Sequence, residues 1–361
     1  MKIGIVTHYN VHNHGALLQL YGLKSILEQY GHTAAALTFK KNFDFMPADS
    51  EKKYNISIKS VLWYLSYIKK HGIKRTYFNY KKKSGLDNFR VPMIGEYYSR
   101  ATNLDAVFIG SDEVFSLESG LNPLFFGFGI PCDNIFSYAG CFGPYTYGKI
   151  EEKNLCGYVG AGLDLMKRIS VRDENSRGIV EKLTNSSPLV VCDPVILYGY
   201  EKEQNSMTVK LPKHKYMLIY AYDNNMNDET EVQRIKDYAK TKGLLVASVG
   251  FYHKWADKNI NANPMELLQY FKNAECVVTD TFHGSVISLI TGSQFVTKLR
   301  GNGNKLADLL NRFSVADRIT EDFTDLSDLF NSKIDYNIVN EKLDISRKES
   351  LDYIENCLSN V

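Results

Sequence analysis

At 361 residues the chain is longer than one ordinary core requires, so two domains are expected. Its composition, with 44% hydrophobic residues, 23% charged residues and 9 prolines, is that of a globular protein, and no apolar run reaches the length of a membrane span. The net charge of +2 indicates no particular partner. The 6 cysteines show no CxxC spacing, which favours reduced thiols in a cytoplasmic protein. The protein is expected to be cytoplasmic, or at most peripheral at the inner membrane face.

The first forty residues predict a strand, a loop, a helix and a second strand. A buried strand over residues 2–6 precedes a polar loop over 7–15. An amphipathic helix over 16–30 follows, and the chain returns as a strand over 33–39. This order favours parallel strands joined by a right-handed crossover.

Residues 40–90 form a basic insertion rich in aromatic residues, with 13 Lys/Arg against 4 Asp/Glu. Within residues 58–83, helical spacing of apolar residues predicts an amphipathic helix, the positions being Ile58, Val61, Leu62, Leu65 and Ile68. Such a helix either packs on its own domain or lies in a membrane interface, and both interpretations stay open. No motif for binding nucleic acid accompanies the charge.

The rest of the chain predicts further strands and helices in alternation. The first domain, residues 1–200, gains strands over 106–109, 135–138, 169–171 and 189–191 and a helix over 174–183. A polar stretch over 198–215 marks the domain boundary, and the second domain covers residues 213–335. Its predicted strands are 217–220, 244–249, 276–279 and 295–299. Its predicted helices are 228–242, 264–273 and 305–312, and a further helix begins near His283. Residues 336–361 predict a terminal helix that packs back. The expected fold class is α/β, with two Rossmann-like domains facing across a cleft where ligands bind.

The stretch VVTDTFHGSVISL, residues 277–289, predicts a buried strand that ends at a helix cap in Asp280-Thr281. His283 then lies in the first turn of a helix, where backbone N–H groups and the helix dipole favour an anion. A purely structural interpretation also stands, in which His283 packs and Gly284 permits close contact between helix and strand.

Two other loops follow predicted strands and carry polar side chains. Residues 7–15 are rich in His and Asn but lack both a dinucleotide fingerprint and the spacing of a metal site. Their polar side chains either suit a sugar or a phosphate or form only a polar turn with a helix cap. In IGSDEVF, residues 109–115, Asp112 either orients a hydroxyl or acts as a base, unless it only caps a helix.

Several cations also follow predicted strands. Arg172 stands directly after the strand over 169–171, and arginine suits bidentate recognition of a carboxylate or a phosphate. Lys298, Arg300 and Lys305 form a further basic group after the last long strand. Each of these residues also has the ordinary interpretation of a surface charge.

Ordered segments resemble the polysaccharide pyruvyl transferase family over residues 2–318. They are NHGALLQLYGLKSIL from Asn13, DAVFIGSDEVF, IFSYAGCFG, ISVRDENS, VVCDPVI, NPMELLQYFKNAECVVTDTFHGSVISL and SQFVTKL. The resemblance implies the fold of two-domain B-type glycosyltransferases. It also implies a transferase of surface polysaccharide biosynthesis, such as capsule or exopolysaccharide, that makes a pyruvate ketal on a sugar.

The resemblance further implies the partners and the roles of residues. Phosphoenolpyruvate serves as co-substrate, without a further cofactor or a metal, and the acceptor is a sugar, including a lipid-linked oligosaccharide. Catalysis is expected from His283 and Asp112. Donor binding is expected from Arg172, His283, Gly284, Ser285, Lys298, Arg300 and Lys305, and acceptor binding from Asn10, Asn13, Gln19, Ser111, Asp112, Glu113 and Phe115.

The chain departs from the family pattern at three positions. Glu113 and Phe115 stand where the pattern GSDQxW has Gln and Trp, and Thr281 stands where some members have Arg. Phe115 keeps an aromatic face for a sugar but loses a hydrogen-bond donor. Two alternatives therefore stay open: a nucleotide-sugar glycosyltransferase of B-type fold, and a non-catalytic protein that binds glycan or phosphate.

Overall fold

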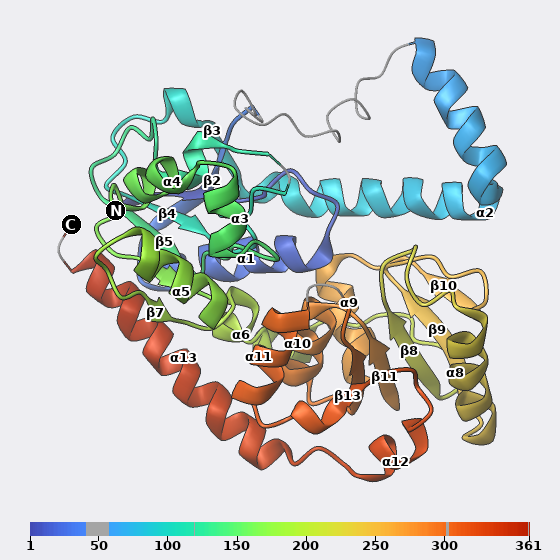
Figure 1. Cartoon of the computed structure of the whole chain (residues 1–361). Helices are drawn as coiled ribbons and strands as arrows, with labels where there is room; N and C mark the ends of the chain where they lie inside the picture. The colour runs from blue at the N-terminus through green and yellow to red at the C-terminus, as the bar shows by residue number, and fades with distance from the viewer. Residues whose placement is uncertain (41–57, 119, 301–302, 360) are drawn as a thin grey trace. The chain divides into compact units, whose positions relative to one another are not determined.

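The computed structural model describes residues 1–40, 58–118, 120–300, 303–359 and 361, and the side chains of residues 58–65 and 304 lie outside this description. The predicted α/β alternation is confirmed (Figure 1). The described residues fall into two compact units. The first takes those within Met1–Glu51, Arg90–Gly199 and Glu341–Val361, and the second those within Lys52–Phe89 and Tyr200–Asn340.

In the described part of the first unit, five parallel strands form a sheet in the order β3-β2-β1-β4-β5. The strands are β1 (Lys2–Val6), β2 (Thr33–Thr38), β3 (Ile94–Tyr97), β4 (Ala106–Gly110) and β5 (Ile135–Tyr138). A short parallel pair, β6 (Ser170–Val171) and β7 (Leu189–Val190), joins β5 through a bridge between Gly140 and Val171. Because β1 and β4 have helices or strands on every side, their residues are almost all apolar and buried.

The helices of the first unit include α1, which follows the polar loop after β1. They are α1 (His14–Gln29), α3 (Tyr147–Glu152), α4 (Cys156–Leu163), α5 (Glu174–Leu183) and α6 (Pro194–Tyr198), with short 3-10 turns at Val91–Met93, Tyr98–Arg100 and Pro123–Phe126. The predicted apolar face of α1 is buried, including Leu17 and Leu27, which have no exposed surface. This face packs toward the sheet and fixes the direction in which the β1 loop points.

The second unit holds, among its described residues, a parallel sheet of six strands in the order β10-β9-β8-β11-β12-β13. The strands are β8 (Tyr216–Tyr220), β9 (Leu245–Val249), β10 (Lys258–Ile260), β11 (Cys276–Thr279), β12 (Phe295–Lys298) and β13 (Ile319–Thr320). The helices are α7 (Glu201–Ser206), α8 (Glu229–Thr241), α9 (Pro264–Lys272), α10 (Phe282–Thr291), α11 (Gly303–Arg312) and α12 (Leu326–Asn331), with a 3-10 turn at Ala316–Arg318.

The basic insertion forms α2 (Ile58–Arg90), which is interrupted at Gly72, where φ is 80°. The sequence places this segment in the first domain, but its described residues from Ile58 to Phe89 group with the second unit. The reason is the inward face of α2. Phe78 packs on Tyr252 with ring centroids 5.7 Å apart, and its carbonyl accepts a hydrogen bond from Asn261 at 3.1 Å.

Part of the predicted amphipathic helix lies outside the description. The side chains of Ile58, Val61, Leu62 and Leu65 belong to that part, as do residues 41–57 of the basic insertion. None of the helices within the described residues is both long enough and apolar enough to cross a membrane.

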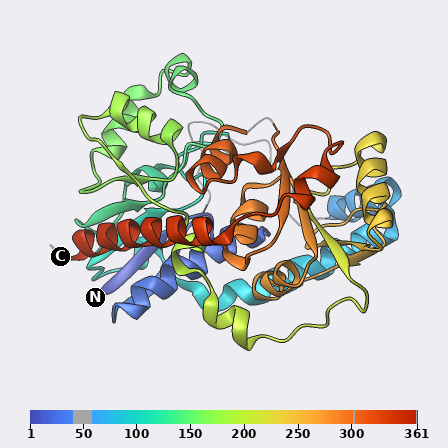
Figure 2. The same ribbon diagram turned by 90° about the horizontal axis from the view of Figure 1, so that it is seen from below.

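The terminal helix α13 (Tyr336–Leu358) packs back on the first unit, as predicted. Tyr353 donates a hydrogen bond to the carbonyl of Ser137 at the end of β5 (2.8 Å), and Arg347 donates to the carbonyl of Ile196 in α6 (2.8 Å). The two chain ends lie near each other in both views (Figure 1, Figure 2). This contact ties the last residues of the chain to the sheet that contains the first.

Candidate functional site

Both sheets reverse their strand order at a central strand. In the first unit β1 lies between β2 and β4, and in the second unit β8 lies between β9 and β11. Ligands of open parallel sheets bind beyond the carboxyl ends of the strands at such a reversal. The loops at these two positions follow β1 and β4 in the first unit and β8 and β11 in the second. The loops after β1 and β4 contain six of the fourteen predicted site residues, and the first turn of α10, after β11, contains three more.

In the first unit, the loops after β1 and β4 touch each other. The Thr7 hydroxyl donates to the carbonyl oxygen of Ser111 (3.3 Å), and Nε2 of His8 lies 3.4 Å from the carbonyl oxygen of Glu113. The structure therefore brings Ser111, Asp112 and Glu113 beside the polar loop that the sequence groups with them.

The turn that carries Asp112 depends on the glycine before it. A Cβ atom at Gly110 would lie 2.1 Å from the carbonyl oxygen of Tyr138, so no side chain fits there. Asp112 itself has a positive φ of 67°, a conformation that aspartate tolerates better than most residues. This backbone presents a partly exposed carboxylate at the end of β4.

Phe115 lies in the core of the first unit and does not face solvent. Its ring has no exposed surface and contacts Phe126 and Phe142, with centroid separations of 5.7 and 5.3 Å. A Cβ atom at Gly140 would lie 2.2 Å from this ring. The predicted contact between Phe115 and a sugar therefore disagrees with the structure, because the ring is buried in the core of the first unit.

The predicted acceptor residues on and before α1 differ in their surroundings. Asn13 caps α1 and accepts a hydrogen bond from the backbone N–H of Gly15 (2.9 Å). Gln19 is 2% exposed and donates to Asp193. Asn10 is exposed and accepts from Arg90. Of these three side chains, Asn10 is the one that faces solvent.

Arg172 is buried in an ion pair. Its Nη1 lies 3.0 Å from Oδ2 of Asp193, and both side chains are at most 3% exposed. The same carboxylate oxygen accepts from Gln19 at 2.5 Å. Burial acts to lower the pKa of Arg172, but Cys141, Asp193 and Asp112 raise it, and the net direction is upward. The guanidinium is therefore permanently charged and held beside residues that the sequence assigns to the acceptor.

In the second unit, TDTFHG has the predicted conformation. Strand β11 ends at Thr279, Thr281 caps α10 by accepting from the N–H of Gly284 (2.9 Å), and His283 lies in the first turn with 9% of its surface exposed. A Cβ atom at Gly284 would lie 2.0 Å from Oγ1 of Thr279. Glycine is therefore required for α10 to approach β11 so closely, as the structural interpretation expects.

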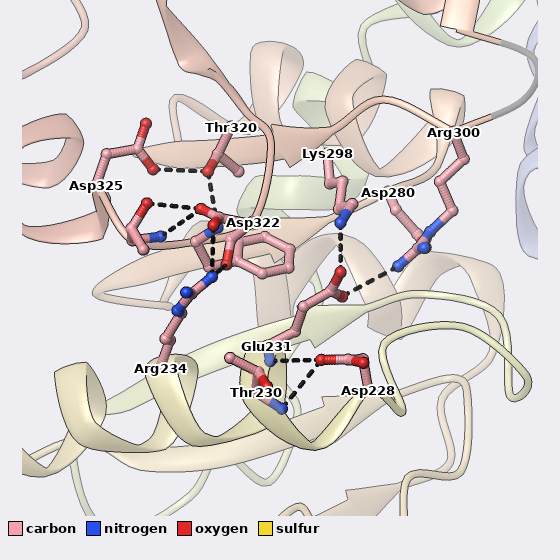
Figure 3. A network of polar contacts seen from close by, with 12 residues as sticks. Asp228, Thr230, Glu231, Arg234, Asp280, Lys298, Arg300, Thr320, Asp322 and Asp325 are labelled. Carbon is pink, nitrogen blue, oxygen red and sulfur yellow. Dashed lines mark hydrogen bonds and ion pairs between the residues drawn. The ribbon is translucent and has the colours of Figure 1, made fainter.

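The cations predicted near His283 have carboxylate partners (Figure 3). Lys298 contacts Glu231, and Nε of Arg300 lies 2.5 Å from Oδ2 of Asp280. A second nitrogen of Arg300 lies 3.6 Å from Glu231. Burial raises the pKa of Asp280 and Arg300 opposes this rise. The network places two cations at the carboxyl edge of β11 and β12 and holds them in fixed positions.

Glu231 owes its place to the start of α8. Asp228 caps this helix and accepts from the backbone N–H groups of Thr230 and Glu231, both at 3.0 Å. One turn later, Arg234 pairs with Asp322 at 2.6 Å (Figure 3). The first turn of α8 is thereby attached to the strand-end loops that carry the cations.

Two other predicted donor residues lie near the first turn of α10, Ser285 within that helix and Lys305 on α11. Ser285 is fully buried, and its hydroxyl lies 3.5 Å from the carbonyl oxygen of Thr281. Nζ of Lys305 lies 5.8 Å from the centroid of the Phe282 ring. Within the described residues, no group of three or more His, Cys, Asp or Glu side chains is arranged to hold a metal ion.

Lys82 is a candidate that the sequence interpretation missed. Its Nζ lies 3.7 Å from the centroid of the Phe251 ring, in the loop after β9. Burial lowers the pKa of Lys82 to about 8, with Asp223 acting in the opposite direction. A signal existed in the sequence, because Phe78, Lys82 and Leu86 share one helical face at spacings of four.

The fold defines a class of two-unit α/β proteins, and solved structures share it. A UDP-N-acetylglucosamine 2-epimerase of Listeria monocytogenes, described as putative, aligns with a TM-score of 0.57 and 9% identity, covering 100% of this chain and 97% of that one. The Neisseria meningitidis UDP-GlcNAc 2-epimerase bound to UDP-GlcNAc gives 0.52 and 10%, covering 100% of both chains. An α,α-trehalose 6-phosphate synthase of Burkholderia multivorans gives 0.52 and 8%, covering 99% and 96%. These likenesses confirm the B-type glycosyltransferase fold.

The sequence itself matches the polysaccharide pyruvyl transferase family over residues 13–298. The chain belongs to this family. A search of curated proteins gave no match. The matched range includes Arg172, the loops that follow β4, β8 and β11 and the entire TDTFHG motif, and it begins at Asn13, the last residue of the loop after β1.

Proposed function

We propose that this chain transfers an enolpyruvyl-derived group from phosphoenolpyruvate to two hydroxyls of one sugar, making a cyclic pyruvate ketal on a surface polysaccharide or its precursor. Family membership over residues 13–298 supports a pyruvyl transferase. The observation that carries the proposal is the place of His283, in the first turn of α10 at the strand reversal of the second sheet. Helix first turns at such edges favour anions, and phosphoenolpyruvate has two anionic groups.

The reaction requires one proton to be added and one phosphate to leave. C3 of phosphoenolpyruvate gains a proton, which makes C2 electrophilic, and the oxygen of a sugar hydroxyl bonds to C2. The second hydroxyl then bonds to C2 while the bond from C2 to the phosphate oxygen breaks, and inorganic phosphate is released. Of the two hydroxyl protons, one balances the proton added at C3 and the other leaves with the phosphate.

The side chains of the chain suit these steps. We assign His283 to the transfer of a proton or to binding of the phosphate, because an imidazole can give or take a proton and can hydrogen-bond a phosphate oxygen. We assign the partly exposed carboxylate of Asp112 to a sugar hydroxyl, with Ser111, Glu113 and Asn10 as further acceptor contacts. Asn13, Gln19 and Phe115 then act by shaping the acceptor loops.

Donor anions need cations that are already held in place. Lys298 and Arg300 supply two such groups beside α10, and Lys305 approaches the same turn. Their carboxylate partners keep the side chains ordered before the donor arrives, which reduces the entropy cost of binding. Because Arg172 is paired with Asp193, we assign it a positioning role as well as the predicted donor contact.

A nucleotide-sugar transferase is the second candidate. One structural relative, from Neisseria meningitidis, is bound to UDP-GlcNAc, and the fold alone accommodates such ligands. In that reaction Lys298 and Arg300 would contact a diphosphate. A non-catalytic glycan- or phosphate-binding protein is the third, and the departures at Glu113, Phe115 and Thr281 are what favour it.

The test compares ligands by thermal shift and calorimetry, with phosphoenolpyruvate, UDP and nucleotide sugars as probes. A ligand that binds the folded state raises Tm by mass action. We expect phosphoenolpyruvate alone to raise Tm, and His283→Ala to reduce this effect. His214→Ala, an exposed histidine of the same unit, serves as the control.

Phosphate release with a panel of sugar acceptors then distinguishes turnover from binding. Stabilisation by UDP or a nucleotide sugar without any response to phosphoenolpyruvate would overturn the proposal in favour of a glycosyltransferase. Binding of phosphoenolpyruvate without phosphate release from any acceptor would favour the non-catalytic protein.

A further inference from the structure

The second half of α2, after the break at Gly72, presents two different faces. On its inward face Phe78 and Leu86 are buried, at 7% and 1% exposed, and Phe78 packs on Tyr252 of the second unit. On the opposite face, Ile73, Tyr77 and Tyr80 are 76%, 61% and 67% exposed. Since residues spaced by three, four and seven share a helical face, these three side chains form one apolar stripe. We name Ile73, Tyr77 and Tyr80 the α2 stripe.

The stripe is flanked by positive charge. Lys74 and Lys81, seven residues apart, follow one side of the stripe, and Lys83 lies on the other, all three exposed. Nζ of Lys81 lies 5.7 Å from the ring centroid of Tyr77, and Lys83 pairs with Asp87 at 2.7 Å. An exposed apolar and aromatic stripe between lysines is the pattern of helices that lie in a membrane interface.

Two cations on the inward face of α2 contact the second unit. Arg75 pairs with Asp223 at 3.4 Å, and Lys82 lies over the Phe251 ring. These two residues attach α2 to the second unit and are not part of the outer face. Among the cations of the second half of α2, Lys74, Lys81 and Lys83 therefore belong to the exposed side of the helix, whereas Arg75 and Lys82 do not.

We propose that the α2 stripe, with Lys74 and Lys81, docks the protein on an anionic lipid surface. The complementary partner is a bilayer with acidic headgroups, because the apolar side chains need an acyl boundary and the flanking lysines need negative charge. If the same surface of a second copy of this chain were the partner, the flanking lysines of one copy would face those of the other, and like charges would repel. If the proposed function holds, the docked surface also keeps the enzyme beside a lipid-linked acceptor, but binding to lipid is measured without that reaction.

Co-sedimentation with vesicles tests the surface directly. The full chain is mixed with vesicles of phosphatidylcholine, with or without phosphatidylglycerol, and the bound fraction is measured. Binding is expected only to the anionic vesicles, falling as salt is added. Lys74→Gln with Lys81→Gln should weaken it about 25-fold, since each lysine near an anionic surface contributes about fivefold. Lys236→Gln with Lys240→Gln, two exposed lysines of α8, makes the same charge change and should have little effect.

A second pair of variants tests the apolar part. Ile73→Ser with Tyr77→Ser and Tyr80→Ser should abolish binding without lowering Tm, because these side chains are exposed. Ile338→Ser with Ile345→Ser, two exposed residues of α13, is the matched control. Vesicle binding that survives both α2 variants would overturn the proposal, as would no binding at all. A monomer–dimer equilibrium that the stripe variant abolishes would assign the surface to a second copy instead.

Discussion

At His283, the local conformation is set by the residues on either side. Thr281 caps α10, Gly284 allows the helix to lie against Thr279, and the imidazole is left in the first turn. Where some members of the family have Arg, Thr281 supplies this cap. The departure at this position therefore has a structural purpose in this chain, and the nearby cations come from Lys298 and Arg300.

Lys82 shows how burial changes a single charge. In the folded chain burial lowers its pKa to about 8, against an ordinary value of 10.5. Below pH 8 both states are protonated and the buried ammonium lowers stability. Between pH 8 and 10.5 the unfolded chain binds more protons than the folded one, so the free energy of unfolding rises with pH in this window.

We predict that Lys82→Met is more stable than the wild type by about 2–3 kcal/mol below pH 8, with the difference disappearing toward pH 10.5. Methionine keeps the packing on Phe251 and removes the charge. Urea unfolding across this pH range measures the effect, and Lys81→Met, on the exposed side of α2, is the control. A difference between Lys82→Met and wild type that does not change with pH would contradict the prediction.

At the scale of elements, one buried carboxylate joins three of them. Asp193 begins α6, accepts from Gln19 on α1 and pairs with Arg172 after β6. Gln19 and Arg172 are more than 150 residues apart in the sequence. A buried pair of this kind fixes geometry, because removal of one partner leaves an uncompensated charge.

We expect Arg172→Met to lower the free energy of unfolding by about 3–5 kcal/mol. Arg177→Met, which removes a surface pair with Glu181, should cost less than about 0.5 kcal/mol. Urea denaturation of both variants gives the comparison, and a double variant with Asp193→Asn measures the coupling. If Arg172→Met were as stable as Arg177→Met while losing phosphoenolpyruvate binding, Arg172 would act on the ligand and not on the fold.

At the scale of the whole molecule, α13 completes the first unit from the far end of the chain. Its residues Ile354 and Cys357 have no exposed surface, and Ser350 accepts from the N–H of Cys192 at 3.0 Å. The chain thus passes from the first unit to the second and returns.

We predict that deletion of residues 341–361 destabilises the first unit selectively. Hydrogen exchange should show lost protection in β5, where Ser137 accepts from Tyr353, and in β7, which leads directly to Cys192, while β8 and β11 keep theirs. Ile345→Ser, an exposed position of the same helix, should leave the exchange of all four strands unchanged. Equal loss of protection in β8 and β11 would show that the two units unfold together.

The sequence by itself determined the order of the long elements and the nature of their ends. Periodicity places α5 at Glu174–Leu183 and β11 at Cys276–Thr279 without error, because both patterns are local. The short helices α3 and α4 and the edge strands β3 and β10 were missed, since few residues carry their signal. The assignment of His283 to a helix first turn is local in the same way and is confirmed.

Tertiary structure alone decided what each side chain meets. The family resemblance implies an aromatic face for a sugar at Phe115, and the place of Arg172 after a strand suggests a cation for a donor, but both side chains are buried. It assigns α2 to the first domain, whereas Phe78 and Asn79 attach it to the second unit. Burial and ion pairing arise between segments that are not neighbours in sequence, and for that physical reason periodicity cannot reveal them.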